Sequence, residues 1–224
     1  MKKFAVLFDM DGVIIDSNPA HKKAIVQFCD KYDKHLSDEE MKRYIWGRTN
    51  KEWIRHLFGE NLPDDQLLVY ADEKELLFRT IYKPDVRPLN GLPAFLDLLK
   101  TNNIPMAIGT SAPRANVDFV FEHTGIEKYF DAVLDERAVT IGKPDPEIYL
   151  KAAKALNFDP AECIVIEDSL SGVEAGKRAG CKVIGITTTH SDAELSKADF
   201  TAPDFSTITL NDLSNIFKPM KYGT

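Results

Sequence analysis

Short apolar segments alternate with helical patterns from residue 92 onward, and this alternation constrains the fold more than any other feature. Segments such as CIVI at 163–166 and KVIGI at 182–186 lack polar alternation, which is typical of strands buried on both faces. Strands that alternate with helices favour a parallel sheet covered by helices on both sides. We therefore predict an α/β protein with a Rossmann-like core. Its strands are expected at 4–8, 104–108, 130–134, 164–166 and 183–186, and its helices at 92–100, 115–123, 146–156 and 172–179.

Helical patterns alone fill the stretch after the first predicted strand. Two segments, Ser37 to Glu40 and Thr49 to Glu52, have the form of capping boxes. No strand signal interrupts this stretch, so we predict an all-helical domain at 17–86, inserted into a core made of 1–16 and 87–224. Hinges are expected near 16–17 and 83–88.

Composition limits the partners. The 224 residues carry a net charge of −7, which disfavours binding to nucleic acid or to an anionic membrane. Cys29, Cys163 and Cys181 form no CxxC pair and lie in apolar patterns, so we interpret them as core residues. Asp9 and Asp11 interrupt the first apolar run too early for a signal peptide. We expect a cytoplasmic protein that acts as a monomer.

Polar residues follow the predicted strands where those strands end. Ligands bind at the carboxyl ends of parallel strands, so these residues should meet at one edge of the sheet. Each motif alone is more often a turn, a helix cap or a solvated loop, and the indication of function comes from their convergence. The converging residues are Asp9, Asp11, Thr110, Ser111, Lys143, Glu167 and Asp168.

This set of residues is chemically coherent. Acidic residues that meet at one point need a cation, and oxygen ligands favour Mg²⁺. We predict that Asp9, Asp168 and the backbone carbonyl of Asp11 bind the metal, while Glu167 orients a metal-bound water. A phosphorylated substrate would then contact the Thr110 hydroxyl and the Lys143 ammonium.

Two adjacent carboxyl groups can divide the work of phosphoryl transfer. Asp9 would attack the phosphorus and form an aspartyl-phosphate. Asp11 would protonate the leaving oxygen and later accept a proton from water.

The motifs resemble those of the haloacid dehalogenase superfamily. DMDGVIIDS, GTS, GKPDP and IEDSLSGVEAGKRAG are similar to its four motifs and occur in the same order. The chain is most similar to the β-phosphoglucomutase-like branch, and the helical insert resembles its C1 cap. The resemblance implies Asp9 as nucleophile, Asp11 as general acid and base, Asp9 and Asp168 as magnesium ligands, and phosphate-binding roles for Thr110 and Lys143.

Substrate contacts from the helical insert are less clearly indicated. By resemblance, His21 and Lys74 occupy positions that the branch uses for substrate, while a surface histidine and a solvated lysine are the alternatives. Arg48 or Asn50, in the loop 47–50, corresponds to a cap arginine of the mutases, and an exposed arginine beside a capping box is the alternative for Arg48. With Ser111 of the core, these residues form the predicted substrate-binding set.

We predict a Mg²⁺-dependent phosphatase that acts on a small phosphorylated metabolite of the sugar-phosphate type. A β-phosphoglucomutase-type sugar phosphate mutase is the alternative, since both reactions use Asp9, Asp11, the metal and the cap. A binding protein without catalytic activity is a more remote alternative.

Overall fold

The structure is a computed structural model that describes residues 4–45 and 49–218. Its backbone contacts divide the chain into two compact units. One unit contains residues 1–16 and 86–224, and the other contains residues 17–85. The division falls within one residue of the boundaries expected from the sequence, while the roles of the units as catalytic core and cap remain proposals.

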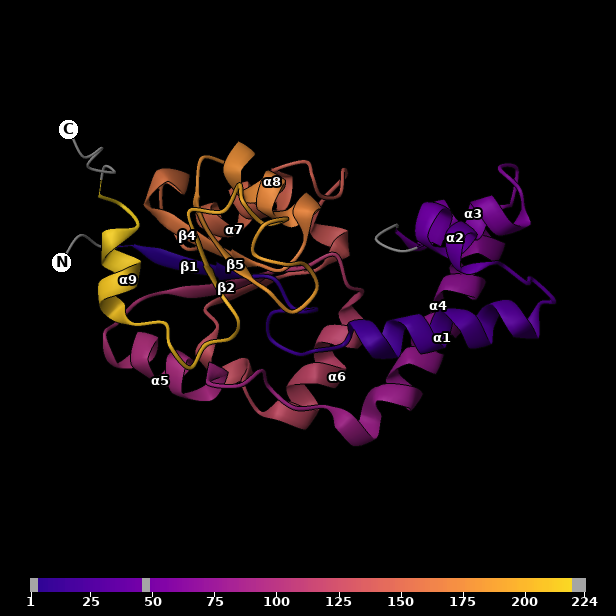
Figure 1. Cartoon of the computed structure of the whole chain (residues 1–224), viewed down its shortest axis with the longest axis horizontal. Coiled ribbons are helices and arrows are strands. Elements are labelled where there is room, and N and C mark those ends of the chain that lie inside the picture. Colours follow the sequence, from indigo (N-terminus) through magenta and orange to yellow (C-terminus); the bar gives the residue numbers. More distant parts are fainter. Residues whose placement is uncertain (1–3, 46–48, 219–224) are drawn as a thin grey trace. The chain divides into compact units, whose positions relative to one another are not determined.

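The larger unit is built on a six-stranded parallel sheet (Figure 1), which confirms the predicted α/β fold class. Along the sheet the strands lie in the order β3-β2-β1-β4-β5-β6. Their bounds are β1 Ala5–Phe8, β2 Met106–Gly109, β3 Ala132–Leu134, β4 Cys163–Glu167, β5 Lys182–Ile186 and β6 Phe200–Ala202.

Helices cover both faces of this sheet, and side chains of β1 alternate between the two layers. Leu7 packs in the core cluster that contains Tyr149 of α7, while Phe8 contacts the rings of Phe95 in α5 and Phe205. Figure 1 shows α7 and α8 on one side of the sheet and α5 on the other. The helices of this unit are α5 Leu92–Thr101, α6 Arg114–Thr124, α7 Glu147–Ala155, α8 Leu170–Arg178 and α9 Leu210–Asn215.

Two elements of the core were missed by the sequence analysis. The edge strand β6 is three residues long, too short to show a period, and Asp199 directly precedes it. The helix α9 is six residues long, and the capping box at Thr209 is the one sequence signal that indicates it.

All the regular secondary structure that the structure describes in the smaller unit is helical, with loops at 32–37 and 59–63. Its helices are α1 Asn18–Lys31, α2 Asp38–Glu40, α3 Asn50–Phe58 and α4 Asp64–Tyr82, with a π-helical turn at Met41–Ile45. Both predicted capping boxes are present, at the starts of α2 and α3. Phe28 and Trp53 are buried at its centre and meet edge to face, with ring centroids 5.4 Å apart.

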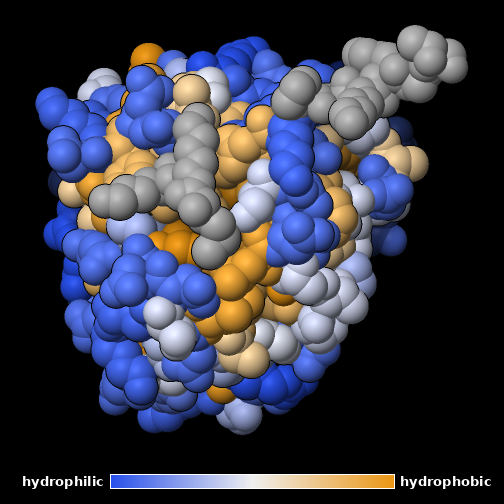
Figure 2. Space-filling model, turned by 90° about the vertical axis from the view of Figure 1, so that its left-hand side faces the viewer, coloured by the Kyte–Doolittle hydropathy of each residue, from blue (hydrophilic) through white to orange (hydrophobic). Residues whose placement is uncertain are grey.

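The surface seen in Figure 2 is mainly hydrophilic, with a band of hydrophobic residues exposed between the hydrophilic ones. Within residues 4–45 and 49–218, no helix combines the length and apolar character needed to cross a bilayer.

Candidate active site

The candidate site lies where the strand order reverses. From β1 the strands follow one another outward on one side as β2 and β3, and on the other side as β4, β5 and β6. The order therefore reverses between β1 and β4, which are neighbours in the sheet. Such a switch point is where parallel sheets of this kind bind ligands. Phe8 pairs in register with Ile166, and the Asp9 backbone N–H donates to the Ile166 carbonyl at 3.0 Å. The residues that follow the two strands are therefore neighbours.

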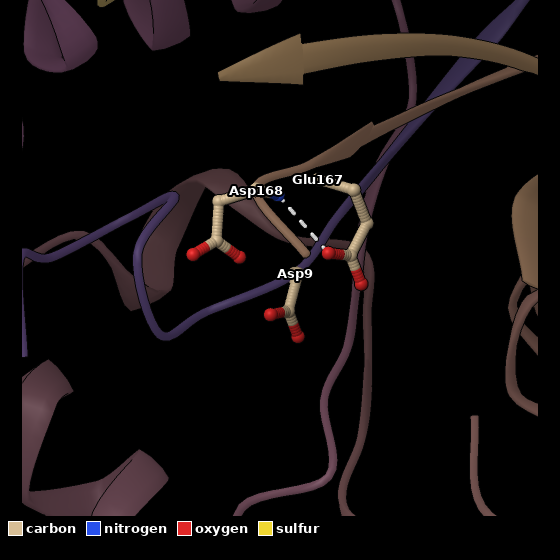
Figure 3. A group of neighbouring side chains, drawn as sticks. All are labelled: Asp9, Glu167 and Asp168. Carbon is tan, nitrogen blue, oxygen red and sulfur yellow. Dashed lines mark hydrogen bonds between the residues drawn. The ribbon is translucent and has the colours of Figure 1, made fainter. Parts of the chain in front are cut away.

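Three buried carboxyl groups meet at this point. Asp9 follows β1, Glu167 ends β4 and Asp168 comes next, and their side chains lie together in Figure 3. One carboxylate oxygen from each lies within 4.8 Å of the others. This arrangement of buried oxygens suits a hard divalent cation.

Lys143 joins two of these carboxylates. Its ammonium donates to Asp9 Oδ1 at 2.8 Å and to Glu167 Oε1 at 2.7 Å, and its side chain is 7% exposed. The sequence analysis placed Lys143 at this edge of the sheet, and the structure brings it there.

Glu167 is held by hydrogen bonds to both carboxylate oxygens. Oε1 accepts from Lys143 and from the Tyr149 hydroxyl, which is 2.8 Å away. Oε2 accepts from the backbone N–H groups of Asp168 and Ser169 and from the Ser169 hydroxyl, at 3.0 to 3.1 Å. Five donors saturate a carboxylate, so this group is fixed and its charge is already compensated by the protein.

The electrostatics differ among the three acids. Burial raises the pKa of Asp9 to about 7, and the charge of Glu167 adds to this rise while Lys143 opposes it. Burial, then the charges of Glu167 and Asp9, raise the pKa of Asp168 to about 8. Burial is the largest single influence on Glu167 and acts to raise its pKa, but the charge of Lys143 and the hydrogen bonds from Lys143, Tyr149 and Ser169 together lower the pKa below its ordinary value. Without a bound cation, Asp9 and Asp168 therefore retain protons near neutral pH.

Asp11 and Thr110 lie at the ends of β1 and β2. Asp11 is half-buried, and its backbone bridges to Ile15 in the turn that Gly12 forms with a φ of 78°. Thr110 is 2% exposed, and its hydroxyl accepts the Ala112 backbone N–H at 3.1 Å. Ser111 is exposed. The roles predicted for these three residues remain proposals.

The sequence analysis missed two threonines that follow β5. Thr189 donates a hydrogen bond to Asp168 Oδ2, and Thr188 donates to the Gly12 carbonyl at 2.5 Å. Thr189 therefore holds the Asp168 carboxyl group, and Thr188 holds the turn at Gly12 that follows β1. The signal that revealed the other residues, a polar side chain just after a strand, also applies to these threonines.

In the helical unit, three of the predicted substrate-binding residues belong to one polar cluster. Lys74 is 4% exposed, and its ammonium lies 3.0 Å from His21 Nδ1 and 2.8 Å from Glu75 Oε1. Asn50 donates to the same Glu75 oxygen at 2.8 Å. The ring of His21 stacks on Phe78 with 3.6 Å between centroids.

These contacts exclude the alternative of a solvated Lys74, because burial of the ammonium requires a partner and Glu75 supplies it. Sequence analysis did not identify Glu75, since one acidic residue on a helix carries no signal. Arg48, the remaining predicted residue of this unit, lies outside the described residues.

Replacement of Gly172 by alanine is expected to lower both stability and activity. Gly172 lies in the first turn of α8, where a Cβ would collide with the carboxylate of Glu167. Alanine gains about 0.5–1 kcal/mol in helix propensity, but overpacking costs about 1–3 kcal/mol, so we expect net destabilisation. Thermal unfolding and turnover rate measure the two effects. Gly142→Ala is the matched control for unfolding, because a Cβ there meets open space. Unfolding of Gly172→Ala at the wild-type temperature would contradict the collision.

The fold and the buried acids at its switch point define a class of α/β proteins with an acidic site at the sheet edge, and comparison with known proteins shows the family. A family model for haloacid dehalogenase-like hydrolases matches residues 5–180. A phosphorylated carbohydrates phosphatase of Thermotoga maritima is 32% identical over 96% of this chain and 98% of its own.

Two solved structures show the same relationship. A family IA hydrolase of Entamoeba histolytica is 33% identical with a TM-score of 0.89, covering 96% of this chain and 100% of its own. A β-phosphoglucomutase of Clostridium difficile is 25% identical with a TM-score of 0.82, covering 96% and 97%. The chain thus belongs to the haloacid dehalogenase-like hydrolase family and is a phosphohydrolase. This confirms the resemblance found in the sequence and removes the alternative of a protein without catalytic activity.

Proposed function

We propose that the protein is a Mg²⁺-dependent phosphatase that hydrolyses a small phosphorylated carbohydrate through an aspartyl-phosphate on Asp9. The observation that carries the proposal is the pairing of Asp9 with Lys143 beside two further buried acids. Similarity to the phosphorylated carbohydrates phosphatase of Thermotoga maritima supports the substrate class.

The acids of the site suit a divalent cation. Asp9, Glu167 and Asp168 are buried together, and Lys143 is the cation that the described residues place between Asp9 and Glu167. Two of the three acids can hold a negative charge only at a high cost, unless a cation joins them. We propose that Asp9, Asp168 and the Asp11 carbonyl bind Mg²⁺. Glu167 already accepts five hydrogen bonds from the protein, so in place of the water-orienting role expected from the sequence we propose that it holds Lys143 beside the metal site. When bound, Mg²⁺ would offset negative charge on the phosphoryl oxygens.

The protein groups then divide the reaction. A carboxylate oxygen of Asp9 forms a bond to phosphorus as the bond to the ester oxygen breaks, and Asp11 donates a proton to that oxygen. In the second half, Asp11 accepts a proton from water as the water oxygen attacks phosphorus and releases Asp9. The Lys143 ammonium and the Thr110 hydroxyl would hold the phosphoryl oxygens.

The polar cluster of the helical unit, formed by His21, Asn50, Lys74 and Glu75, indicates which groups the substrate would present to it. A mutase must hold a second phosphate firmly, and that requires an available cation. The charge of Lys74 is already compensated by Glu75, which lies 2.8 Å away. At Lys74 this pairing favours neutral hydroxyl groups over a second phosphate, so we propose that His21, Asn50 and Lys74 contact sugar hydroxyls. We propose hydrolysis as the main reaction because it needs no anchor for a second phosphate, whereas the mutase alternative would depend on Arg48. Ser111 of the core and Arg48 complete the proposed substrate-binding set.

A β-phosphoglucomutase activity is the second candidate, and the similarity to the mutase of Clostridium difficile favours it. Incubation with β-glucose 1-phosphate, Mg²⁺ and a trace of the 1,6-bisphosphate separates the two. We expect inorganic phosphate to be released, and faster release from another sugar or polyol phosphate. Rapid formation of glucose 6-phosphate with little free phosphate, lost in Arg48→Ala, would replace the phosphatase by the mutase.

A further inference from the structure

Tyr149 lies beneath the proposed active site, and the chemistry derived above does not use it. It belongs to α7 and is fully buried. Its hydroxyl donates to Glu167 Oε1 at 2.8 Å, and the same oxygen accepts from the Lys143 ammonium at 2.7 Å. Two donors therefore share one carboxylate oxygen.

The ring of Tyr149 also contacts the second of these donors. The Lys143 nitrogen lies 5.0 Å from the ring centroid, a distance at which an aromatic face attracts a cation. The same nitrogen lies 2.8 Å from Asp9 Oδ1. Tyr149 thus contacts both the ammonium and the acid that competes with Asp9 for it.

Gly109, the residue before Thr110, lies near the Tyr149 ring. A Cβ on Gly109 would lie 3.4 Å from the Tyr149 ring, an ordinary contact distance, so the end of β2 passes close to this ring. Glu167 is fixed through the Asp168 and Ser169 donors to its other oxygen. The tyrosine therefore joins the ends of β2 and β4 to the loop that carries Lys143.

We propose that Tyr149 is a positioning residue that keeps Lys143 available to Asp9 and to the phosphoryl group. The Tyr149 hydroxyl donates a hydrogen bond to Glu167 Oε1 and so stabilises part of the negative charge on that oxygen. Without the hydroxyl, the charge of Glu167 is compensated at this oxygen by Lys143 alone, and the ammonium shifts from Asp9 toward Glu167. This inference rests on the proposed role of Lys143 in binding phosphate.

The test is Tyr149→Phe, which removes the hydroxyl and retains the ring. We expect kcat/KM to fall about tenfold, as for loss of one hydrogen bond to a buried charge. A second readout does not depend on turnover. By calorimetry in Mg²⁺, the dissociation constant of inorganic phosphate is expected to rise about fivefold to tenfold.

Ile148→Val is the matched control, since it loses a methylene from the neighbouring buried residue and no hydrogen bond. A merely structural role of Tyr149 would make both variants alike, with lower unfolding temperatures and unchanged phosphate binding, and that result would overturn the proposal. A wild-type chain that binds phosphate but hydrolyses no ester would instead contradict the proposed function, and the binding arm would still decide the role of Tyr149. A wild-type chain that binds no phosphate would overturn both.

Discussion

Asp9→Asn is expected to reduce phosphate release at least about a thousandfold while leaving the fold intact, because an amide cannot attack phosphorus as a carboxylate does. Asparagine has the shape of aspartate and removes one of three crowded acids. Since burial raises the pKa of Asp9, the neutral side chain is expected to leave the metal-free unfolding temperature unchanged or higher. Phosphate release and thermal unfolding measure the two effects.

The control for this substitution is Asp118→Asn. Asp118 lies on the surface of α6 and pairs with Arg114 at 2.7 Å, so its charge contributes little. Its activity should match that of the wild type. Near-full activity of Asp9→Asn would show that the nucleophile lies elsewhere.

Chelation of divalent metal is expected to abolish turnover and to make stability depend on pH. In the metal-free chain, burial raises the pKa of Asp9 to about 7 and that of Asp168 to about 8. Between about pH 4 and pH 8 the folded chain therefore binds more protons than the unfolded chain, and its stability falls as the pH rises. Bound Mg²⁺ takes the place of these protons. The Mg²⁺-induced rise in unfolding temperature should thus be small at pH 5 and reach at least about 5 °C at pH 8.

Glu167 acts in the opposite direction and in another window. Burial acts to raise the pKa of Glu167, but Lys143 and the hydrogen bonds to this carboxylate together lower it. The stabilisation from Glu167 is therefore lost only as the pH falls below about 4.5. The Asp9→Asn chain is the internal control, because it should lose part of the decline between pH 5 and pH 8. A Mg²⁺ effect on unfolding that is equal at both pH values would contradict a metal site formed by these acids.

The sequence predicted the sheet and the residues at its edge because two strong regularities coincide. Strands such as CIVI are apolar on both faces, and polar residues that follow several parallel strands gather at the edge of the sheet where such folds bind ligands. Asp9, Lys143 and Asp168 were found in this way.

Other features leave no such trace. The pairing of Lys74 with Glu75 depends on burial within the helical unit, and a helical pattern alone does not reveal it. Tyr149 lies on the buried face of a regular helix, where any aromatic residue satisfies the pattern, and its hydroxyl bond to Glu167 depends on the tertiary structure. The short strand β6 is stabilised by its pairing with β5, and the strand propensity of its own three residues does not predict it.

The position of the acids at the crossover also affects when the enzyme becomes competent during folding. Lys143 and Asp9 are 134 residues apart in the chain, and β1 pairs on one side with β2 and on the other with β4. Local helices can form early, but pairing of such distant strands is slow because long loops must close first. Catalytic power therefore requires the long-range pairing of β4 with β1, which brings Asp9 beside Glu167 and Asp168. A partially folded chain with most of its helices in place would remain inactive.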